Sequence, residues 1–592
     1  MRLSVSFFRG CAVLFVPLCL VLASCTDATS RNAGTGSSLP HSHVDDHSHA
    51  TLPSTTPSVY PDRIVLTWSK DPASTLSVSW RTDSTVTGAR AQIAVARAEP
   101  SFYTEARTVR AETTSLPVDE ADQDNVAAHY HTVTFEGLES DSLYAYRVGN
   151  GTHWSEWVHA RTASDEPEPF SFIYLGDAQN NIRSHWSRLI RQAYADASNV
   201  SFMVHAGDLV NNTHSNLEWG HWNEAGGFIQ RMVPSVAVPG NHEYEGYPPN
   251  SKMVEDTVLV NVHISGSKMD GEMVLPNGYT AALTATRDRS PDAIDAHPLT
   301  GTWGYSVAGL DGTLQIDEGQ PTGYSGVISD PRDGSELVLQ NISVEDDSLS
   351  GEFLAAFEED ELSIHWRPQF ALPENGPEGL KETVYYLDHQ GMRVIGLNSA
   401  GLNDENALVN QTAWLESTLE DARQDDGIRW IVATFHHPMF SSGEGRNNEW
   451  LRKAWKPIFD EYNVDLVMQG HDHTYARGRA SNLSQGVNAR SPVGGTVYVN
   501  SVSGAKMYEI KPNRWDDFDS VEMKRGGENT QLYQVVHVKR DTMTYRSYTA
   551  TGTLYDAFDL VKRPGEPNEM IEHDVAGTPE RTHENTILYE RP

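Results

Sequence analysis

Three apolar runs within residues 170–243 constrain the fold of this 592-residue chain more than any other feature. The runs 170–177, 202–208 and 236–241 each end in glycine followed at once by Asp or Asn. An apolar run that ends at glycine is typical of a buried strand, and apolar residues at helical spacing over 184–198 separate the first two runs. The segment predicts a β-α-β-α-β unit with polar side chains at the carboxyl ends of its strands, where open α/β sheets bind ligands.

Two later apolar runs end in histidines instead. The first precedes His436 and His437, and the second precedes His471 and His473. A single Asp after glycine is usually a turn or helix cap, and a single His is usually an ordinary polar residue, so only the ordered set favours a site. Oxygen and imidazole ligands together suit two divalent or trivalent metal ions. The candidate ligands at strand ends are Asp177, Asp208, Asn241, His436, His471 and His473.

Five short motifs resemble the signature blocks of the metallophosphoesterase (calcineurin-like) superfamily, and specifically its purple acid phosphatase-like branch. In chain order they are GDAQ at 176–179, GDLVNN at 207–212, GNHE at 240–243, FHHP at 435–438 and GHDH at 470–473. The resemblance implies an α/β fold, a four-layer αββα sandwich. It also implies that Asp177 and His473 bind one metal ion, that Asn241, His436 and His471 bind the other, and that Asp208 bridges them.

The resemblance also implies a reaction, in which a metal-bound hydroxide attacks phosphorus in line. Asp208 suits the bridging position because a carboxylate has two oxygens and offsets the charge of two cations. His242 adjoins a ligand, so we expect it to hydrogen-bond phosphoryl oxygens or to protonate the leaving group. His437 and Arg446 are candidate substrate contacts; the alternatives are support of a ligand for His437 and a solvated loop residue for Arg446.

The second motif departs from the purple acid phosphatase pattern. There the family has a tyrosinate that binds ferric iron and gives the colour, whereas this chain has Asn211. We therefore expect a colourless protein, with Fe, Mn, Zn and Mg all open as metals. Gln179 stands where many metallophosphoesterases have a His ligand. Gln179 and Asn211 are further candidate ligands.

The first 25 residues resemble a bacterial lipoprotein signal. Arg2 and Arg9 flank the start, the apolar stretch 11–22 is too short to span a bilayer comfortably, and Cys25 follows Leu-Ala-Ser. This predicts an exported protein, periplasmic or at the cell surface, held to the membrane only through a lipid on Cys25. An ordinary secretory signal is the alternative.

Residues 26–59, rich in His, Ser, Thr and Pro, are interpreted as a flexible tether, with metal sequestration by its histidines as the alternative.

Hydrophobic patterning divides the rest of the chain. Residues 60–164 alternate with period two and carry Tyr144 where a fibronectin type III-like sandwich has its corner tyrosine, as in the domain that precedes the catalytic domain of plant-type purple acid phosphatases. The catalytic domain is expected at 165–250 and 366–562. Residues 251–365 show no helical period and predict a β-rich insertion, and 563–592 predict a polar C-terminal tail.

The net charge of −36 argues against a nucleic-acid scaffold, which needs a basic face.

We expect a dimetal-dependent phosphoric ester hydrolase that acts on a small phosphate ester. The first interpretation is an acid phosphatase-like phosphomonoesterase, and a phosphodiesterase or a nucleotidase is also possible from the sequence. One alternative is a catalytically weak surface binding or adhesion protein on the same scaffold. A third is a polysaccharide- or lipid-processing esterase with the same metal centre. Oligomeric state stays open.

Overall fold

The computed structural model describes residues 56–582, apart from short internal gaps. The predicted signal, Cys25 and most of the tether lie outside the described residues, as do residues 583–592 of the predicted tail. The gaps are 117–125, 245–251, 275–279, 288–299, 308–309, 320–322, 330–335, 346, 360–361, 402–404, 481–494, 519–520, 564–565 and 576.

The first domain is an all-β sandwich of two four-stranded antiparallel sheets. Trp80, Ile93 and Tyr146 are buried in its core. The hydroxyl of Tyr144 accepts the backbone N–H of Glu139 at 2.8 Å, which is the corner contact expected of a fibronectin-like sandwich. In sheet order the strands are β1 (Asp62–Thr67), β2 (Leu76–Thr82), β6 (Ala128–Phe135) and β5 (Glu112–Leu116), then β4 (Arg107–Arg110), β3 (Arg90–Val95), β7 (Leu143–Gly149) and β8 (Val158–Arg161), with a short helix η1 (Pro100–Glu105).

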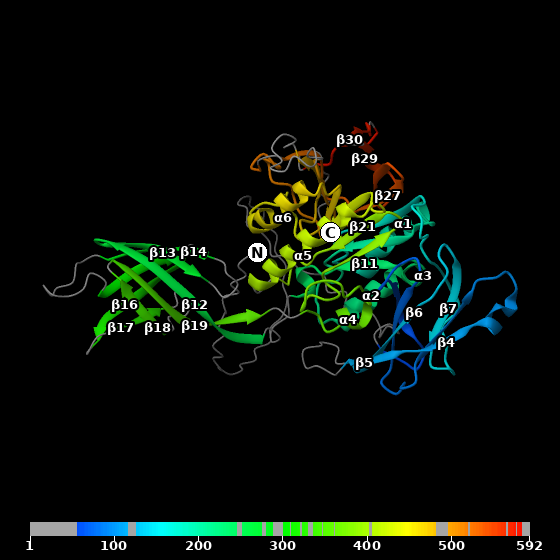
Figure 1. Ribbon diagram of the computed structural model, residues 1–592, viewed down its shortest axis with the longest axis horizontal. Coiled ribbons are helices and arrows are strands. Elements are labelled where there is room, and N and C mark those ends of the chain that lie inside the picture. Colours follow the sequence, from blue (N-terminus) through cyan, green and yellow to red (C-terminus); the bar gives the residue numbers. More distant parts are fainter. Residues whose placement is uncertain are drawn as a thin grey trace, which may run out of the picture.

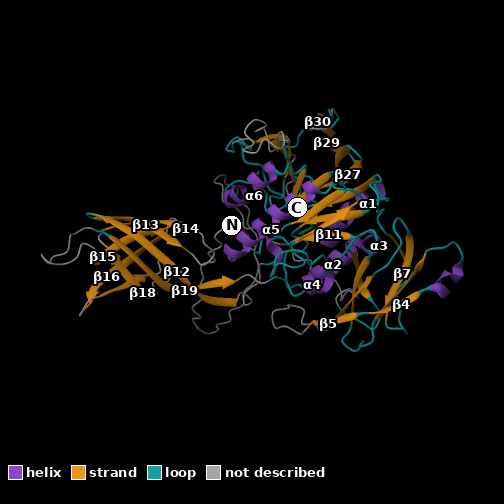
Figure 2. Cartoon of the chain, viewed as in Figure 1, coloured by secondary structure: helices purple, strands orange, loops and turns teal. Residues whose placement is uncertain are grey.

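Two seven-stranded mixed sheets form the catalytic domain (Figure 2). The first follows the order β11 (Ser235–Val238), β10 (Phe202–Ala206), β9 (Phe170–Leu175), β27 (Leu532–Lys539), β28 (Thr542–Thr549), β29 (Leu554–Arg563) and β30 (Glu566–Glu572). The second follows the order β20 (Tyr385–His389), β21 (Met392–Gly396), β22 (Trp430–Thr434), β23 (Leu466–Gln469), β25 (Val497–Asn500), β24 (Tyr475–Ala480) and β26 (Val521–Gly527). Strands β9, β10 and β11 run parallel, as do β21, β22, β23 and β25.

Alternating side chains build the four layers, because successive residues of a strand face opposite sides of the sheet. Val432 and Met468 of the second sheet belong to the same apolar core as Phe172 of the first sheet. Ile431 and Val467 instead pack with residues of the helices α5 and α6 on the outside. None of the described helices is long and apolar enough to cross a bilayer. The catalytic-domain helices are η2 (Ile182–Trp186), α1 (Ser187–Asp196), α2 (Asn216–Gly226), α3 (Phe228–Met232), η3 (Asn241–Glu243), α4 (Trp366–Gln369), α5 (Glu405–Gln424) and α6 (Glu449–Glu461).

The segment predicted as a β-rich insertion contains a closed eight-stranded antiparallel barrel with its own apolar core around Trp303 and Leu314. Figure 1 shows it projecting from the rest of the molecule on the extended strands β12 and β19. The first residues of β12, from Lys252 onward, pair only with the end of β19, so a two-stranded stalk carries the barrel. The strands are β12 (Lys252–Ser265), β13 (Lys268–Val274), β14 (Thr280–Thr286), β15 (Gly301–Val307), β16 (Leu310–Gly319), β17 (Gly323–Ser329), β18 (Glu336–Glu345) and β19 (Ser348–Glu359).

The chain leaves for the barrel and returns from it at a single point. The backbone N–H of Ser363 donates to the carbonyl of Glu243 at 2.8 Å, and the Ser363 hydroxyl donates to the carbonyl of Thr213 at 2.8 Å. The insertion therefore begins directly after the GNHE motif and ends beside it.

The predicted C-terminal tail needs a correction. Residues 566–572, expected to lie outside the sheets, form β30 and pair antiparallel with β29. Arg477 of β24 donates to Glu572 at 2.8 Å, which fixes this strand to the second sheet. An edge strand shows little apolar alternation, and Pro567 is tolerated there because one side needs no ladder hydrogen bonds. The polar sequence of this segment therefore gave no strand signal.

Candidate metal centre

The structure brings the six strand-end residues together where the two sheets meet. Asp177, Asp208 and Asn241 follow β9, β10 and β11 of the first sheet. His436 follows β22 and His471 follows β23 of the second sheet, with His473 two residues further on. Parallel strands end at one edge of a sheet, so the facing sheets deliver both sets of side chains to one place.

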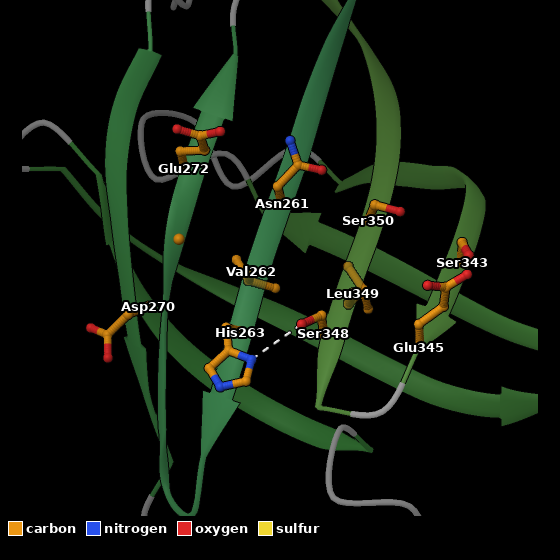
Figure 3. A pocket seen from close by; sticks show the side chains of 11 residues that line it. Asn261, Val262, His263, Asp270, Glu272, Ser343, Glu345, Ser348, Leu349 and Ser350 are labelled. Atoms are coloured by element: carbon orange, nitrogen blue, oxygen red, sulfur yellow. Dashed lines mark hydrogen bonds between the residues drawn. The ribbon is translucent and has the colours of Figure 1, made fainter.

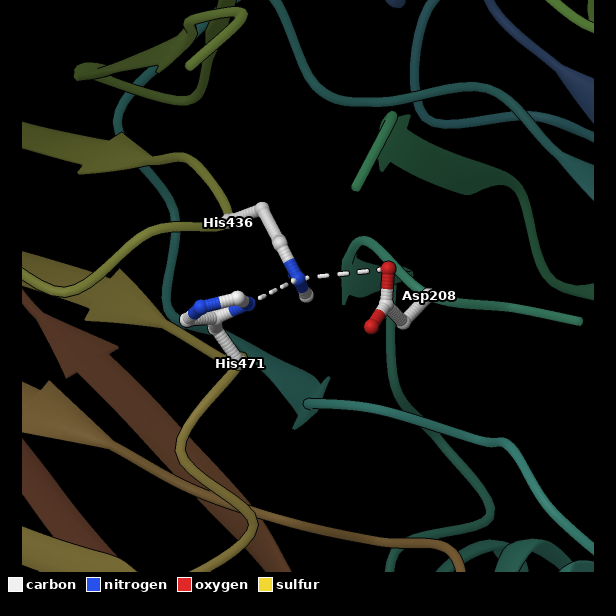
Figure 4. A group of neighbouring side chains, drawn as sticks. All are labelled: Asp208, His436 and His471. Atoms are coloured by element: carbon white, nitrogen blue, oxygen red, sulfur yellow. Dashed lines mark hydrogen bonds and ion pairs between the residues drawn. The ribbon is translucent and has the colours of Figure 1, made fainter. Parts of the chain in front are cut away.

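Asp208, His436 and His471 form one group of metal-ligand type, shown in Figure 4. His436 Nε2 lies 3.2 Å from Asp208 Oδ1 and 3.2 Å from His471 Nδ1. Asn241 Oδ1 lies 2.9 Å from His471 Nδ1 and 3.1 Å from His436 Nε2. Two oxygens and two ring nitrogens thus converge on a common point.

Asp177, Asp208 and His473 form a second group, and their ligand atoms all lie within 4.8 Å of one another. Asp208 belongs to both groups, which is the geometry of a carboxylate shared by two cations. His473 Nδ1 is buried and has no hydrogen-bonding partner among the described residues. A buried polar atom without a partner is costly, and a metal ion would satisfy it. The residues present therefore fit a pair of metal ions.

The glycines of the motifs make room for the carboxylates. A Cβ on Gly240 would lie 2.2 Å from Asp208 Oδ1, and one on Gly470 would lie 2.6 Å from Asp177 Oδ2. The chain also turns sharply at the ligands, since Asp208 has φ +52°. Asp177, His471 and His473 also have positive φ. Such conformations cost free energy in non-glycine residues and persist where surrounding contacts hold them.

Hydrogen bonds to other groups fix the orientation of the ligand side chains. His436 Nδ1–H donates to the carbonyl of Ala206 at 2.9 Å, so Nε2 is the nitrogen that faces the centre. The backbone N–H of His471 donates to both carboxylate oxygens of Asp177 at 2.9 Å. These contacts prearrange the ligands.

The two carboxyl groups of the centre, Asp177 and Asp208, have pKa values shifted in opposite directions. Burial raises the pKa of Asp177 to about 8. Burial also acts to raise the pKa of Asp208, but the nearby His436 and His242 lower it below its usual value. Burial opposes charge on His436, yet Asp208 raises the pKa of that ring to about 9. Without metal the centre therefore holds protons that cations displace on binding.

Sequence reasoning missed Glu243, a fully buried residue. Its carboxylate accepts the backbone N–H groups of Asp208 at 2.9 Å, Leu209 at 2.8 Å and Gly240 at 2.7 Å. It thus joins the GDLVNN turn to the GNHE turn. Burial raises its pKa to about 7. Its place in the GNHE motif was the available signal.

Asp472, between two ligand histidines, was also missed. It is buried and accepts the backbone N–H groups of Ser442 at 2.6 Å and Gly443 at 3.1 Å, and the hydroxyl of Ser441 at 2.8 Å. Arg446 lies 3.3 Å from the same carboxylate. Asp472 therefore ties the 441–446 loop to the loop that carries His471 and His473.

His242 is partly exposed at the rim of the centre. Its Nδ1–H donates to the carbonyl of Asn211 at 2.7 Å, and its backbone N–H donates to Asp208 Oδ1 at 3.0 Å. The backbone N–H of Asn211 donates in turn to Glu218 Oε2 at 2.6 Å. Asn211, a predicted ligand candidate, thus acts through its main chain to orient His242.

The other predicted residues surround the centre in different ways. The amide nitrogen of Gln179 contacts Asp208 Oδ2, and its buried Oε1 has no partner among the described residues. The ring of His437 lies 4.3 Å from that of His471, and its Nδ1 hydrogen-bonds Ser399 Oγ at 3.1 Å. Arg446 donates to the carbonyl of His471 as well as pairing with Asp472.

A hollow on the barrel lies away from this chemistry. Asp270, Glu272, Glu345 and His263 line it over β12, β13, β18 and β19 (Figure 3). His263 Nδ1 hydrogen-bonds Ser348 Oγ at 3.1 Å. Within the described residues, groups of three ligand-type side chains gather only at the sheet edges, so we place the candidate active centre there.

Comparison with known families agrees with this geometry. Residues 61–162 match the family model of the purple acid phosphatase N-terminal domain. Residues 170–303 and 350–475 match the model of the calcineurin-like phosphoesterases. The chain belongs to the purple acid phosphatase-like branch of this superfamily. The predicted fold class is confirmed, and the family implies divalent metal ions at the centre.

Individual relatives cover different shares of the chain. An uncharacterized protein of Mycobacterium tuberculosis is 31% identical over 140 residues, 22% of this chain and 26% of its own length. An acid phosphatase of Aspergillus ficuum is 23% identical over 483 residues, 73% of this chain and 76% of its own. A purple acid phosphatase from yellow lupin seeds has the same fold, with a TM-score of 0.54 and 14% identity, covering 84% of this chain and 74% of that one. The chain thus matches about a quarter of the length of the first relative.

Proposed function

We propose that this protein is a dimetal-dependent phosphoric ester hydrolase, an acid phosphatase-like phosphomonoesterase. The observation that carries the proposal is the pair of ligand groups that share Asp208. Bound metal ions would activate a water molecule and offset the negative charge of the phosphoryl group. Asp177 and His473 would hold one ion, and Asn241, His436 and His471 the other.

The remaining residues would bind and orient the substrate. His242, held by the Asn211 carbonyl through Nδ1, keeps its other ring nitrogen for a phosphoryl oxygen or for the leaving-group oxygen. The ring of His437 lies 4.3 Å from that of His471, and His437 is a second candidate contact. Arg446 would add positive charge, although Asp472 offsets part of it.

Hydrolysis of p-nitrophenyl phosphate and of bis-p-nitrophenyl phosphate, after chelation and after return of Mn, Zn, Fe or Mg, tests the proposal. We expect metal-dependent turnover that Asp208→Ala abolishes, with the monoester as the faster substrate. A faster diester would change the substrate class and leave the centre in place. A folded, metal-loaded protein that turns over neither ester would reject the enzyme.

We expect the metal-loaded protein to be colourless, because Asn211 replaces the tyrosinate that gives purple acid phosphatases their colour. The measurement is a visible absorption spectrum of the protein loaded with ferric iron, with metal content determined on the same sample. An intense band at full iron occupancy would show that another residue supplies a phenolate.

A second candidate function is surface binding through the barrel. The barrel has a core and a stalk of its own, which supports this hypothesis. Its charge supports it too, since residues 252–359 contain 19 Asp and Glu against 5 Lys and Arg. Such a surface favours a cationic partner. Absence of turnover in the folded, metal-loaded protein would favour this function over the hydrolase.

We also propose export and anchoring through a lipid on Cys25, which rests on the sequence of residues 1–25. Mass spectrometry of the mature N-terminus tests this. An acylated Cys25 as first residue is expected, and an unmodified start at another residue would reject the anchor.

A further inference from the structure

Lys506 and Tyr508 lie beside the half of the centre formed by Asp177, Asp208 and His473. They belong to the segment after β25. The backbone N–H of Tyr508 donates to the carbonyl of His473 at 3.1 Å. The two rings lie 4.9 Å apart at 79°. Tyr508 and a candidate ligand therefore pack edge-to-face, while 38% of Tyr508 stays exposed.

Two cations lie over the Tyr508 ring. The Arg446 guanidinium carbon lies 5.1 Å from the ring centroid, and Lys506 Nζ lies 5.8 Å from it. Arg446 is already paired with Asp472. Lys506 is partly buried and forms no ion pair with any carboxylate of the described residues.

The charge of Lys506 reaches the metal centre. Burial is the largest influence on the pKa values of Asp177 and His473, and Lys506 lowers both. A chain with a net charge of −36 repels anions at long range. A cation left without a carboxylate beside the ligands is therefore suited to holding an anionic substrate.

We propose that Lys506 and Tyr508 form the leaving-group subsite of this centre and select phosphomonoesters of planar aromatic alcohols. This inference rests on the proposed hydrolase function. The exposed part of the Tyr508 ring would meet the aromatic group edge-to-face, and Lys506 would hold an anionic oxygen of the ester. In hydrolysis water supplies the new P–O bond, the ester P–O bond breaks, and the leaving-group oxygen takes a proton.

The two cations favour an aromatic leaving group over an aliphatic one. Cations over an aromatic ring make its edge more positive, and this edge attracts the π-face of a second ring placed against it. A glycerol-like leaving group has no flat face and gains nothing from this arrangement. The contribution of Tyr508 should therefore appear in the preference between the two substrate kinds, whereas Lys506 should serve both.

Affinities of the non-hydrolysable ligands phenylphosphonate and methylphosphonate for the metal-loaded protein give a readout that needs no turnover. Calorimetry should show that Tyr508→Leu weakens phenylphosphonate binding about fivefold and changes methylphosphonate binding by less than twofold. Tyr508→Phe keeps the ring and should match the wild type. Equal losses for both ligands in Tyr508→Leu, or no loss for either, would overturn the subsite.

Lys506→Gln should weaken both ligands about tenfold or more, because it removes a charge from the site. Lys524→Gln is the matched control, since Lys524 is exposed and pairs with Glu522. An effect of Lys506→Gln no larger than that of Lys524→Gln would remove Lys506 from the site. Thermal unfolding of each variant shows whether it is folded.

Kinetics then separate this inference from the function on which it rests. If the wild type hydrolyses phenyl phosphate and glycerol phosphate, Tyr508→Leu should raise KM about fivefold for phenyl phosphate alone. An unchanged ratio of kcat/KM values would reject the subsite and keep the hydrolase. A wild type that hydrolyses neither ester yet binds phenylphosphonate through Tyr508 would reject the hydrolase and keep the subsite.

Discussion

Glu243 binds no metal in the proposed arrangement, yet the geometry of the centre depends on it. Its two oxygens accept backbone N–H groups from both turns that carry ligands, those of Asp208 and Gly240 among them. A carboxylate is suited to this position because it only accepts hydrogen bonds, on two oxygens. The positive φ of Asp208 is held in place by these bonds.

Glu243→Gln should therefore weaken metal binding about 10- to 100-fold, which is typical for loss of a group that orients ligands. It should also lower the free energy of unfolding by about 2 kcal/mol, since an amide NH₂ would face buried N–H donors. Metal titration and chemical denaturation of the same samples check this. Glu522→Gln, at an exposed site, is the control; equal behaviour of the two variants would contradict the role of Glu243.

His389 on β20 sets a limit on acid stability. It is buried against Phe170, Phe202 and Trp68, and neither ring nitrogen has a hydrogen-bonding partner among the described residues. Burial lowers its pKa to about 3. Between pH 6.5 and 3 the unfolded chain therefore binds a proton that the folded chain does not, so stability falls as the pH falls through that window.

His389→Leu should remove this dependence. The wild type is expected to lose about 2 kcal/mol more stability than the variant between pH 7 and pH 5. Urea unfolding at both pH values measures the difference, with the exposed His159→Leu as control. Parallel losses in wild type and His389→Leu would mean that the ring is protonated in the folded protein.

At the level of elements, helix α2 connects the two domains to the rim of the centre. Arg63 and Arg81 of the first sandwich donate to the carbonyl and the side-chain oxygen of Asn216, at 2.7 and 3.0 Å. In the first turn of α2, Glu218 accepts the backbone N–H of Asn211, whose carbonyl holds His242. The sandwich thus supports a catalytic candidate through α2.

Glu218→Gln should lower kcat about three- to tenfold and leave metal affinity within twofold, because it loosens His242 and no ligand. Steady-state kinetics and metal titration separate the two effects. Glu224→Gln on the same helix is the control, since Glu224 pairs with Arg183 at the surface. A change in metal affinity larger than the change in kcat would place Glu218 among the supports of the ligands.

The same elements show what the sequence allows one to predict. Strands β9, β10 and β11 and helices α5 and α6 follow from hydrophobic periodicity, because that signal is local. Pairing is not local: nothing in 252–359 indicates that β12 closes on β19, and β30 has no apolar face. Glu243 and Asp472 were not predicted as site residues because they accept hydrogen bonds from backbone N–H groups. The residue types in a sequence do not show which backbone groups a side chain contacts. The candidate ligand set could be predicted because these residues follow strand ends in a fixed order.

For the whole molecule, the barrel is the most independent part. It has its own core, and its ends meet at the hydrogen bond between Ser363 and Glu243. Replacing residues 245–361 by a short glycine-rich linker should keep the catalytic domain folded and its metal affinity within about threefold, because closing a short loop costs little. Circular dichroism, thermal unfolding and metal titration check this. Loss of folding in the shortened chain would show that the barrel supports the catalytic core.

The position of the stalk has an evolutionary meaning. In the chain, both of its strands lie between the turn that carries Asn241 and His242 and Ser363, which hydrogen-bonds back to Glu243 of that turn. A module exchanged at this point joins the chain next to the GNHE motif while every candidate ligand keeps its place. Selection can therefore replace the module by recombining one segment of the gene, without passing through variants that have lost the residues of the candidate metal centre.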